Sequence, residues 1–312
     1  MIDTHTHLTD PWFDKDRDEV IERAFQSGIE KIVEIATEPK EWEPTLKLCQ
    51  KYPGKILCAI GFHPHCAHEW NDSYEKTLLD LARDPLVLGF GEIGIDYAKS
   101  AADPNTQKQV FEKLLSIANE ASKPIILHCR EGGKGRAHDD MFEVLENVWE
   151  PMKTFSSERR KRSQFSLPLD GGGQGGGDKE DSFITPHLNP PPQGGRKVEQ
   201  RGGKRFSGVQ HCFSGDLNNA KKALSMKLAI GIDGPITYPK NDKFRKTILD
   251  VGLDNIVLET DCPYLPPQSI RGKRNEPSKI PEIAQSLADL FNVPLNEVIK
   301  VTTRNAVDLF EI

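Results

Sequence analysis

The sequence predicts an α/β protein with the (β/α)8 TIM-barrel fold. Eight short runs of β-branched and aliphatic residues alternate with segments of helical spacing, which is typical of a parallel sheet. Outside one unusual window these units occupy about 257 residues, close to the roughly 250 of an ordinary barrel. A doubly wound sheet is the alternative. That fold usually carries a Gly-x-Gly-x-x-Gly turn after its first strand, whereas here the first strand leads into His-Thr-His.

The order of the elements places all strand ends on one rim. The predicted strands are residues 1–5, 31–36, 55–61, 86–92, 124–128, 207–211, 228–232 and 255–261. Helical spacing is clearest over residues 16–26, 106–120, 138–149, 217–226 and 240–251. The carboxyl ends of parallel strands meet at one face of a barrel, and enzymes of this fold place their active sites there.

Composition excludes several classes of protein. The chain has 312 residues, of which 37% are hydrophobic, and a net charge of -6. Recurring aliphatic runs exclude disorder throughout, while a mean hydropathy of -0.53 without a long apolar run excludes a membrane span. The six cysteines contain no Cys-x-x-Cys pair, and the first residues carry no targeting signal. We therefore expect a cytoplasmic protein with reduced thiols.

Residues 151–205 differ from the rest of the chain. They hold 10 of the 25 glycines and 6 of the 22 prolines, with 11 basic and 6 acidic side chains. The remaining residues therefore carry a net charge of -11. We predict a single domain over 1–312, interrupted at about 152–205 by a Gly/Pro-rich, disordered insert between the fifth helix and the sixth strand. Translated repeat DNA is one hypothesis for this insert, and a basic arm for nucleic acid is the other.

Two histidines end the first predicted strand. His5 and His7 are two residues apart, so in a strand both imidazoles point to the same face. Two exposed histidines would give the same pattern. The position at the active-site rim of a barrel favours a shared ligand for the pair.

Further metal-type side chains end other predicted strands. Glu92 closes the fourth strand, His128 the fifth, His211 the sixth and Asp261 the eighth. Each alone is more often a structural hydrogen bonder, but six nitrogen and oxygen donors on five strands at one rim favour a divalent-metal site. Six ligands are too many for one open catalytic ion and enough for two ions that share a carboxylate, the arrangement that hydrolyses phosphoesters.

A series of motifs resembles a known family. The sequence resembles the TatD family of metal-dependent deoxyribonucleases, within the amidohydrolase-like barrels, and the motifs cover nearly the whole chain except the insert. In order, they are Asp3-Thr-His-Thr-His-Leu8, Gly61-Phe-His-Pro-His65, Gly91-Glu-Ile-Gly-Ile-Asp-Tyr97, His128-Cys-Arg130, His211-Cys-Phe-Ser214, Glu259-Thr-Asp-Cys-Pro-Tyr-Leu265 and Arg271-Gly-Lys-Arg-Asn-Glu-Pro277.

The resemblance implies two divalent ions, Mg²⁺, Mn²⁺ or Zn²⁺. By this resemblance His5, His7, Glu92 and Asp261 hold one ion, and Glu92, His128 and His211 hold the other, so that Glu92 bridges them. Asp261 would also accept the proton of the attacking water, which makes Asp261 and Glu92 the expected catalytic residues.

Substrate contacts follow from the same motifs. Family positions imply that His65, Arg130, Arg271, Lys273 and Arg274 contact the substrate. A solvated charged loop is the alternative for the last three. We expect His63 to hydrogen-bond within its own loop, and Asp96 and Tyr97 to orient Glu92 or shape the rim.

Three cysteines each follow a predicted ligand. Neighbouring residues in a strand point to opposite faces, so Cys129, Cys212 and Cys262 are expected to face the helix layer rather than the ions.

These observations predict a metal-dependent hydrolase of DNA phosphodiesters, a 3′→5′ exodeoxyribonuclease. A barrel with a net charge of -11 cannot hold a long duplex by charge alone, so DNA ends or short single strands are the expected substrates. The sequence does not determine the oligomeric state, and a monomer is compatible with it. Hydrolysis of another ester or amide, such as an aminoacyl-RNA ester, is the alternative, and a non-catalytic binding protein is a further one.

Overall fold

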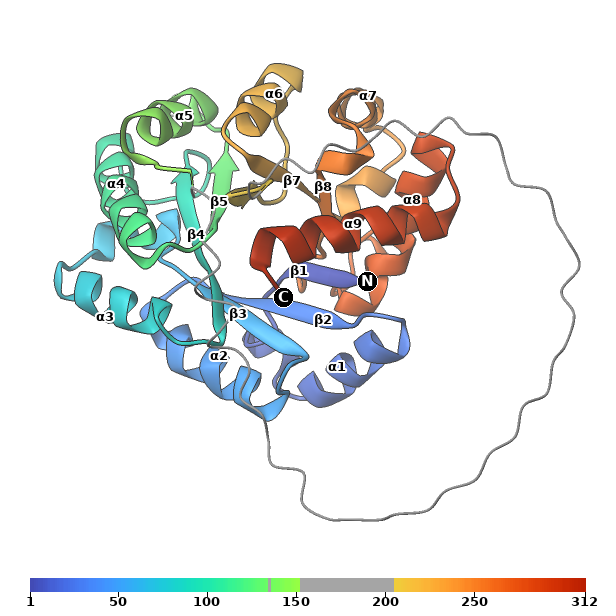
Figure 1. Cartoon of the computed structure of the whole chain (residues 1–312), viewed down its shortest axis with the longest axis horizontal. Coiled ribbons are helices and arrows are strands. Elements are labelled where there is room, and N and C mark those ends of the chain that lie inside the picture. Colours follow the sequence, from blue (N-terminus) through green and yellow to red (C-terminus); the bar gives the residue numbers. More distant parts are fainter. Residues whose placement is uncertain (134–135, 152–204) are drawn as a thin grey trace, which may run out of the picture. The chain divides into compact units, whose positions relative to one another are not determined.

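Eight parallel strands form one sheet in the order in which they occur along the chain. The computed structural model describes residues 1–133, 136–151 and 205–312. The strands are β1 (Ile2–Thr6), β2 (Lys31–Ala36), β3 (Ile56–Ile60), β4 (Val87–Asp96), β5 (Ile125–Arg130), β6 (Gly208–Gln210), β7 (Leu228–Ile232) and β8 (Ile256–Leu258). The TIM-barrel prediction is confirmed, and Figure 1 shows the strands surrounded by their helices.

The sheet closes where β8 meets β1. Thr6 forms a parallel bridge with Cys262, and the His7 amide donates to the Cys262 carbonyl at 2.8 Å. The Asp261 amide donates to the His5 carbonyl at 3.0 Å. Closure therefore joins the first strand to the segment after the last strand and places the His5–His7 segment directly beside Asp261.

Each predicted helix is present, with ends within two residues of the prediction. These are α1 (Arg17–Gln26), α4 (Pro104–Ala121), α5 (Ala137–Val148), α6 (Leu217–Ser225) and α7 (Asp242–Val251). Local signals fix their starts: the Asp103 carboxylate accepts from the Asn105 and Thr106 amides, and Asp216 forms a capping box with Asn219. The remaining helices are α2 (Pro39–Lys51), α3 (Ser73–Ala82), α8 (Ile280–Phe291) and α9 (Leu295–Phe310).

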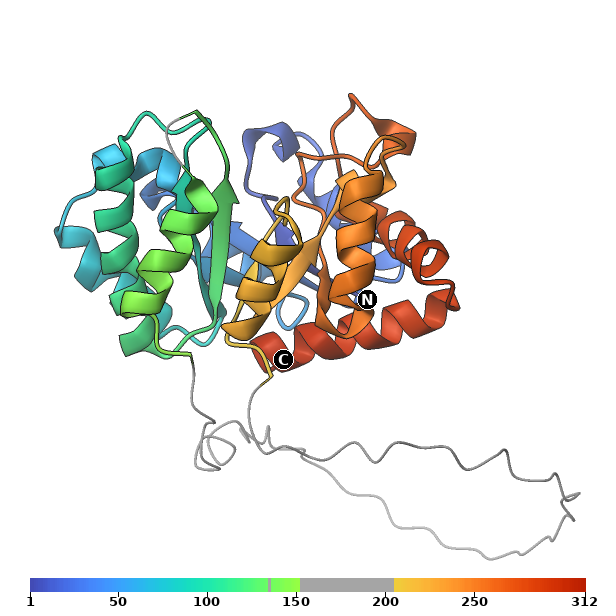
Figure 2. The ribbon, with the colours of Figure 1, turned by 90° about the horizontal axis from the view of Figure 1, so that it is seen from above.

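Two apolar layers hold the barrel together. The larger lies between the strands and the surrounding helices, and a smaller one fills the barrel interior. Leu309 and Phe310 of α9 belong to the interior layer, and Asn305 of the same helix donates to the Ile256 carbonyl at 2.8 Å. Helix α9 therefore closes the end of the barrel opposite the carboxyl ends of the strands, and Figure 2 shows it crossing that end. None of the described helices is long and apolar enough to cross a membrane.

The ends of several strands differ from the prediction. Strand β5 continues to Arg130, so His128 lies inside the strand rather than at its end. Strand β4 continues to Asp96, so Glu92 lies inside the strand rather than at its end. Its pairing with β5 resumes after an irregularity between Gly91 and Ile93, which the apolar pattern does not reveal. Strands β6 and β8 end at Gln210 and Leu258, so His211 and Asp261 lie on the loops that follow.

The 152–205 insert lies between α5 and β6, as predicted, but apart from Arg205 it is outside the described residues. Its predicted disorder and its role stay predictions. The chain leaves α5 and enters β6 at the rim opposite the strand carboxyl ends, where barrel connections seldom carry chemistry.

We predict that replacing residues 153–203 by a short Gly/Ser linker leaves hydrolysis and thermal unfolding near those of the intact chain, because long surface connections change loop entropy slowly. Parallel activity assays and melting curves of both proteins check this. A loss of activity without a change in melting temperature would contradict it and assign the insert a function.

Candidate metal centre and active site

The His5–His7 pair at the end of β1 converges as predicted. The two Nε2 atoms lie 3.2 Å apart, and His5 is fully buried. Buried Glu34 of β2 fixes the following backbone. One of its carboxylate oxygens accepts from the Thr6 hydroxyl and the Leu8 amide, and the other accepts from the Thr9 amide, each at 2.8 Å. The segment that carries His7 is thus held from the neighbouring strand.

Asp261 faces this pair from the loop after β8. Its Oδ1 lies 3.4 Å from His7 Nε2, and 3.8 Å from both His5 Nε2 and His211 Nε2. The other ring nitrogen of His211, Nδ1, lies 3.1 Å from Oε1 of buried Glu259. A carboxylate behind a ligating histidine fixes the orientation of the ring and strengthens its basicity. Glu259 has this relation to His211.

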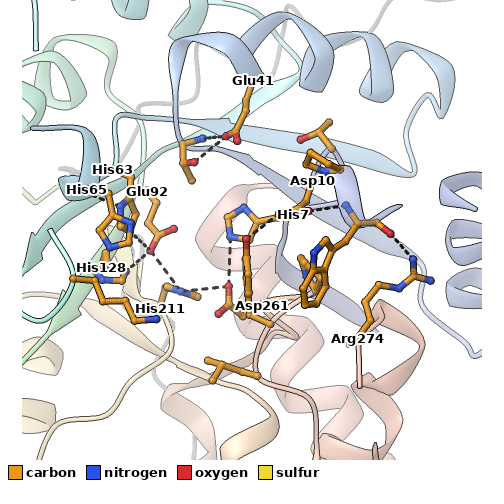
Figure 3. Close-up of a pocket in the computed structure, with 18 of the residues that line it drawn as sticks. His7, Asp10, Glu41, His63, His65, Glu92, His128, His211, Asp261 and Arg274 are labelled. Carbon is orange, nitrogen blue, oxygen red and sulfur yellow. Dashed lines mark hydrogen bonds and ion pairs between the residues drawn. The ribbon is translucent and has the colours of Figure 1, made fainter. Parts of the chain in front are cut away.

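Glu92 stands at the centre of the site, as Figure 3 shows. Its Oε2 lies 3.5 Å from His5 Nε2. Its Oε1 lies 2.5 Å from His128 Nδ1 and 3.6 Å from both His63 Nε2 and His211 Nε2. One oxygen of this carboxylate therefore faces His5, and the other faces the remaining three histidines.

The sequence analysis missed the part that His63 plays. Its Nδ1 accepts from the His65 amide at 3.0 Å, as expected for a loop histidine, but its Nε2 faces Glu92. The signal was present in Gly61-Phe-His-Pro-His65, which repeats the His-x-His spacing of the first motif.

Asp96 contacts His128 rather than Glu92. Its Oδ2 lies 3.1 Å from the Nε2 atoms of His128 and His65, and Arg130 donates to it at 3.3 Å. Its Oδ1 accepts from the Ala98 and Lys99 amides. Tyr97 donates to Asp140 at 2.5 Å and so contributes to the packing of the rim.

The donor atoms fit divalent metal ions. Within the described residues, four groups of three donors lie within 4.8 Å of one another: His5, His7 and Asp261; His63, Glu92 and His128; His5, His211 and Glu259; and His211, Cys212 and Asp261. Imidazole and carboxylate donors are the set that Zn²⁺ and Mn²⁺ accept. The convergence of buried donors, rather than an exposed acidic patch, supports a metal centre.

Cys212 departs from the predicted arrangement. Buried Cys129 and Cys262 belong to the apolar layer between strands and helices, as expected, whereas Cys212 lies within reach of His211 and Asp261. Strand β6 ends two residues earlier and Cys212 has a φ of 45°, so strand alternation no longer sets its direction.

Charges in the metal-free site balance within the cluster. Burial alone would raise the pKa of Glu92, but His63, His211 and His128 outweigh it and hold that pKa well below its usual range. Burial would also raise the pKa of Asp261, but the facing His211 and His7 outweigh burial and lower that pKa. Despite burial, Asp261 raises the pKa of His7 to about 9, and Glu259 with Glu92 raises that of His211 to about 10. Burial lowers the pKa of His63 to about 4.

The predicted substrate residues all lie around one cavity of about 820 Å³ above the metal centre. His65 and Arg130 sit on one side, both against Asp96. The Arg271 guanidinium stacks on the Tyr238 ring at 4.4 Å, and Lys273 lines the same mouth.

The Arg274 guanidinium forms its hydrogen bonds with other residues of the protein. Its guanidinium donates two hydrogen bonds to Asp16, at 2.8 and 2.6 Å, and one to the Trp12 carbonyl at 2.6 Å. It also lies over the Phe13 ring at 4.6 Å. These contacts favour a role in holding the loop after β1 over a direct contact with substrate.

Comparison with known proteins decides the family. The model of the family described as TatD related DNase matches residues 2–311. The chain belongs to the TatD-related DNase family. This places the barrel and its His/Glu/Asp cluster among metal-dependent hydrolases that act on ester bonds, and it supports the nuclease prediction over the ester or amide alternative.

Similar proteins cover both chains almost completely. The chain is 27% identical to the uncharacterized metal-dependent hydrolase YabD of Bacillus subtilis, over all of this chain and 99% of YabD. It is 30% identical to the 3′-5′ ssDNA/RNA exonuclease TatD of Edwardsiella piscicida, over all of both chains. The crystal structure of YjjV, a TatD homolog from Escherichia coli, has a TM-score of 0.74 at 25% identity and covers 100% of this chain and 98% of YjjV.

We predict that metal binding releases protons at neutral pH. In the metal-free protein His7 and His211 are protonated below about pH 9 and 10, and an ion binds only the neutral imidazole. The affinity for Mn²⁺ should therefore rise between pH 6.5 and 8, by about tenfold per pH unit for each proton released. Titration calorimetry in buffers of different ionisation enthalpy counts these protons, with exposed His68→Ala as the control. A pH-independent affinity without proton release would contradict this charge assignment.

Proposed function

We propose that this chain is a two-metal exonuclease that removes nucleotides from the 3′ ends of single-stranded DNA or RNA. The observation that supports the proposal is the central position of Glu92, whose Oε2 faces His5 while its Oε1 faces His128 and His211. The relatives named as 3′-5′ ssDNA/RNA exonucleases supply the substrate class and the direction of attack.

The ligand assignment follows the two sides of Glu92. His5, His7 and Asp261 would hold one ion with Glu92, and His128 and His211 would hold the other with the same carboxylate. His63 is a further candidate ligand for the second ion because its Nε2 lies 3.6 Å from Glu92. Mg²⁺, Mn²⁺ and Zn²⁺ remain the candidate ions.

The chain's own residues would orient and move the groups that react. Bound divalent ions supply Lewis acidity, which makes water more acidic and neutralises charge on phosphoryl oxygens. Asp261, ionised at neutral pH and at the mouth of the cavity, would accept the proton of the attacking water. The water oxygen forms a bond to phosphorus, the bond to the leaving sugar oxygen breaks, and that oxygen takes up a proton.

Cations around the mouth would hold the substrate phosphates. Arg130 lies near His128, because both contact the same Asp96 oxygen, and Arg271 and Lys273 line the same cavity. His65 would add a contact beside Arg130, while Arg274 would act through the loop that it holds. Local binding suits a body with a net charge of -11, which repels a long polyanion. The cytoplasmic location stays a prediction, and the oligomeric state is left open.

We predict metal-dependent release of mononucleotides from single-stranded DNA labelled at its 5′ end, with full-length substrate shortening one residue at a time. The same preparation is assayed on a 3′-labelled strand, on a blunt duplex and on an aminoacyl-RNA ester. Addition of EDTA should stop the reaction. Intact DNA in both Mg²⁺ and Mn²⁺, together with ester cleavage, would overturn the nuclease proposal.

We predict that Glu92→Ala abolishes turnover without unfolding the protein. Removing the shared carboxylate should lower kcat by about 10²–10³-fold or more, the range for loss of one electrostatic group in a transition state. Circular dichroism and metal analysis accompany the assay, and Glu143→Ala, an exposed acid on α5, is the matched control. Near-normal turnover with two bound ions would refute the bridging role.

A further inference from the structure

Two exposed aromatic rings stand at the mouth of the metal-site cavity. The Trp12 side chain is 59% exposed and that of Tyr264 is 48% exposed. Within the described part of the chain, these are the only aromatic residues among the strongly exposed large hydrophobic ones, and both line the cavity. Rings that stay exposed beside a cavity contribute less to the packing of the fold than buried rings, and their faces are open to a ligand.

One carboxylate holds both rings in place. Asp10 Oδ1 accepts from the Trp12 amide at 2.8 Å, and Asp10 Oδ2 accepts from the Tyr264 hydroxyl at 2.9 Å. The loop after β1 is thus tied to the loop after β8 across the mouth, and the two ring centroids lie 6.5 Å apart. Figure 3 shows Asp10 and Arg274 on the His7 side of the cavity.

The backbone beneath the rings is fixed as well. Arg274 donates to the Trp12 carbonyl at 2.6 Å, and buried Asn275 donates to the Tyr264 carbonyl at 2.8 Å. The indole N–H of Trp12 has no partner among the described residues, so its ring is positioned by the backbone and is available to a ligand. Ordered backbone with an open ring face is the arrangement of a preformed binding surface.

The pair is adjacent to the metal centre. The Tyr264 ring lies edge-on to His7 at 5.9 Å between centroids, so His7, Tyr264 and Trp12 form a row that leads out of the site. Cationic Arg271 and Lys273 line the same mouth. A ligand that crosses this surface would meet ring faces next to cations, which suits a chain of bases and phosphates.

We propose that Trp12 and Tyr264 form a stacking platform for an unpaired base next to the scissile phosphodiester. The inference rests on the proposed nuclease function and adds a source of substrate selectivity to it. Every base has a π-face, so the platform accepts any base but only one that is free of its neighbours. A base inside a duplex is already stacked on both faces, so a single-stranded end is preferred.

The test compares two single-stranded DNA oligonucleotides of equal charge. They share one sequence, but in the second the last three 3′ nucleotides carry tetrahydrofuran in place of a base. For the wild type and for Trp12→Ala, kcat and KM are measured on both in Mg²⁺. On the base-bearing strand, Trp12→Ala should raise KM by about tenfold, the value of one base–aromatic stack, and change kcat much less. On the abasic strand, Trp12→Ala should raise KM far less.

Two further variants separate stacking from folding. Trp12→Phe keeps an aromatic face and should recover most of the lost affinity. Leu249→Ala removes an exposed aliphatic side chain on α7 and should leave kcat and KM unchanged on both strands. If Trp12→Ala raised KM equally on both strands, or did not raise it on the base-bearing strand, the platform would be overturned.

A binding measurement in EDTA keeps the platform and the activity distinguishable. Stacking on Trp12 should quench tryptophan fluorescence of the wild type with the base-bearing strand, more than with the abasic strand and more than in Trp12→Phe. Such quenching without cleavage of either strand in Mg²⁺ and Mn²⁺ would refute the nuclease function but retain the platform. Cleavage without base-dependent quenching would retain the nuclease function and refute the platform.

Discussion

The buried carboxylate of Glu92 is the constraint on which the rest of the site depends. An ionised acid removed from water is costly unless opposite charge or strong hydrogen bonds compensate it. Four imidazoles surround it, and each comes from a different part of the sheet: His5 in β1, His63 after β3, His128 in β5 and His211 after β6. Only a closed barrel brings these segments together, so the fold and the charge balance of the site require each other.

Further buried acids hold several of the predicted ligands in their positions. Glu34 fixes the backbone after His7, Asp96 holds His128, and Glu259 holds His211. The last contact also needs space, because a Cβ on Gly231 would lie 2.5 Å from the Glu259 carboxylate. A buried carboxylate thus orients His128 and another orients His211, and contacts of this kind let a site keep its geometry when its charge changes.

Periodicity was enough to predict the barrel, the five helices named from the sequence and the convergence of His5 with His7, because these features depend on local spacing. The position of Glu92 inside β4 depends on a register irregularity with β5, which no single strand reveals. The direction of Cys212 depends on a left-handed backbone at the end of β6. The orientation of Arg274 depends on its hydrogen bond to Asp16, which lies near the other end of the chain. What could not be predicted was therefore set by contacts between distant segments.

In the proposed function, charge and stacking would each contribute to recognition of the substrate. A uniformly basic surface would bind duplex and single strand alike, because phosphate contacts do not distinguish them strongly. Here the described barrel is acidic overall, and its cations at the mouth lie beside the exposed rings of Trp12 and Tyr264. A substrate phosphate would therefore be attracted at the place where an unpaired base could also stack. In this proposal, selectivity for free ends would come from two weak interactions at one place rather than from one strong interaction.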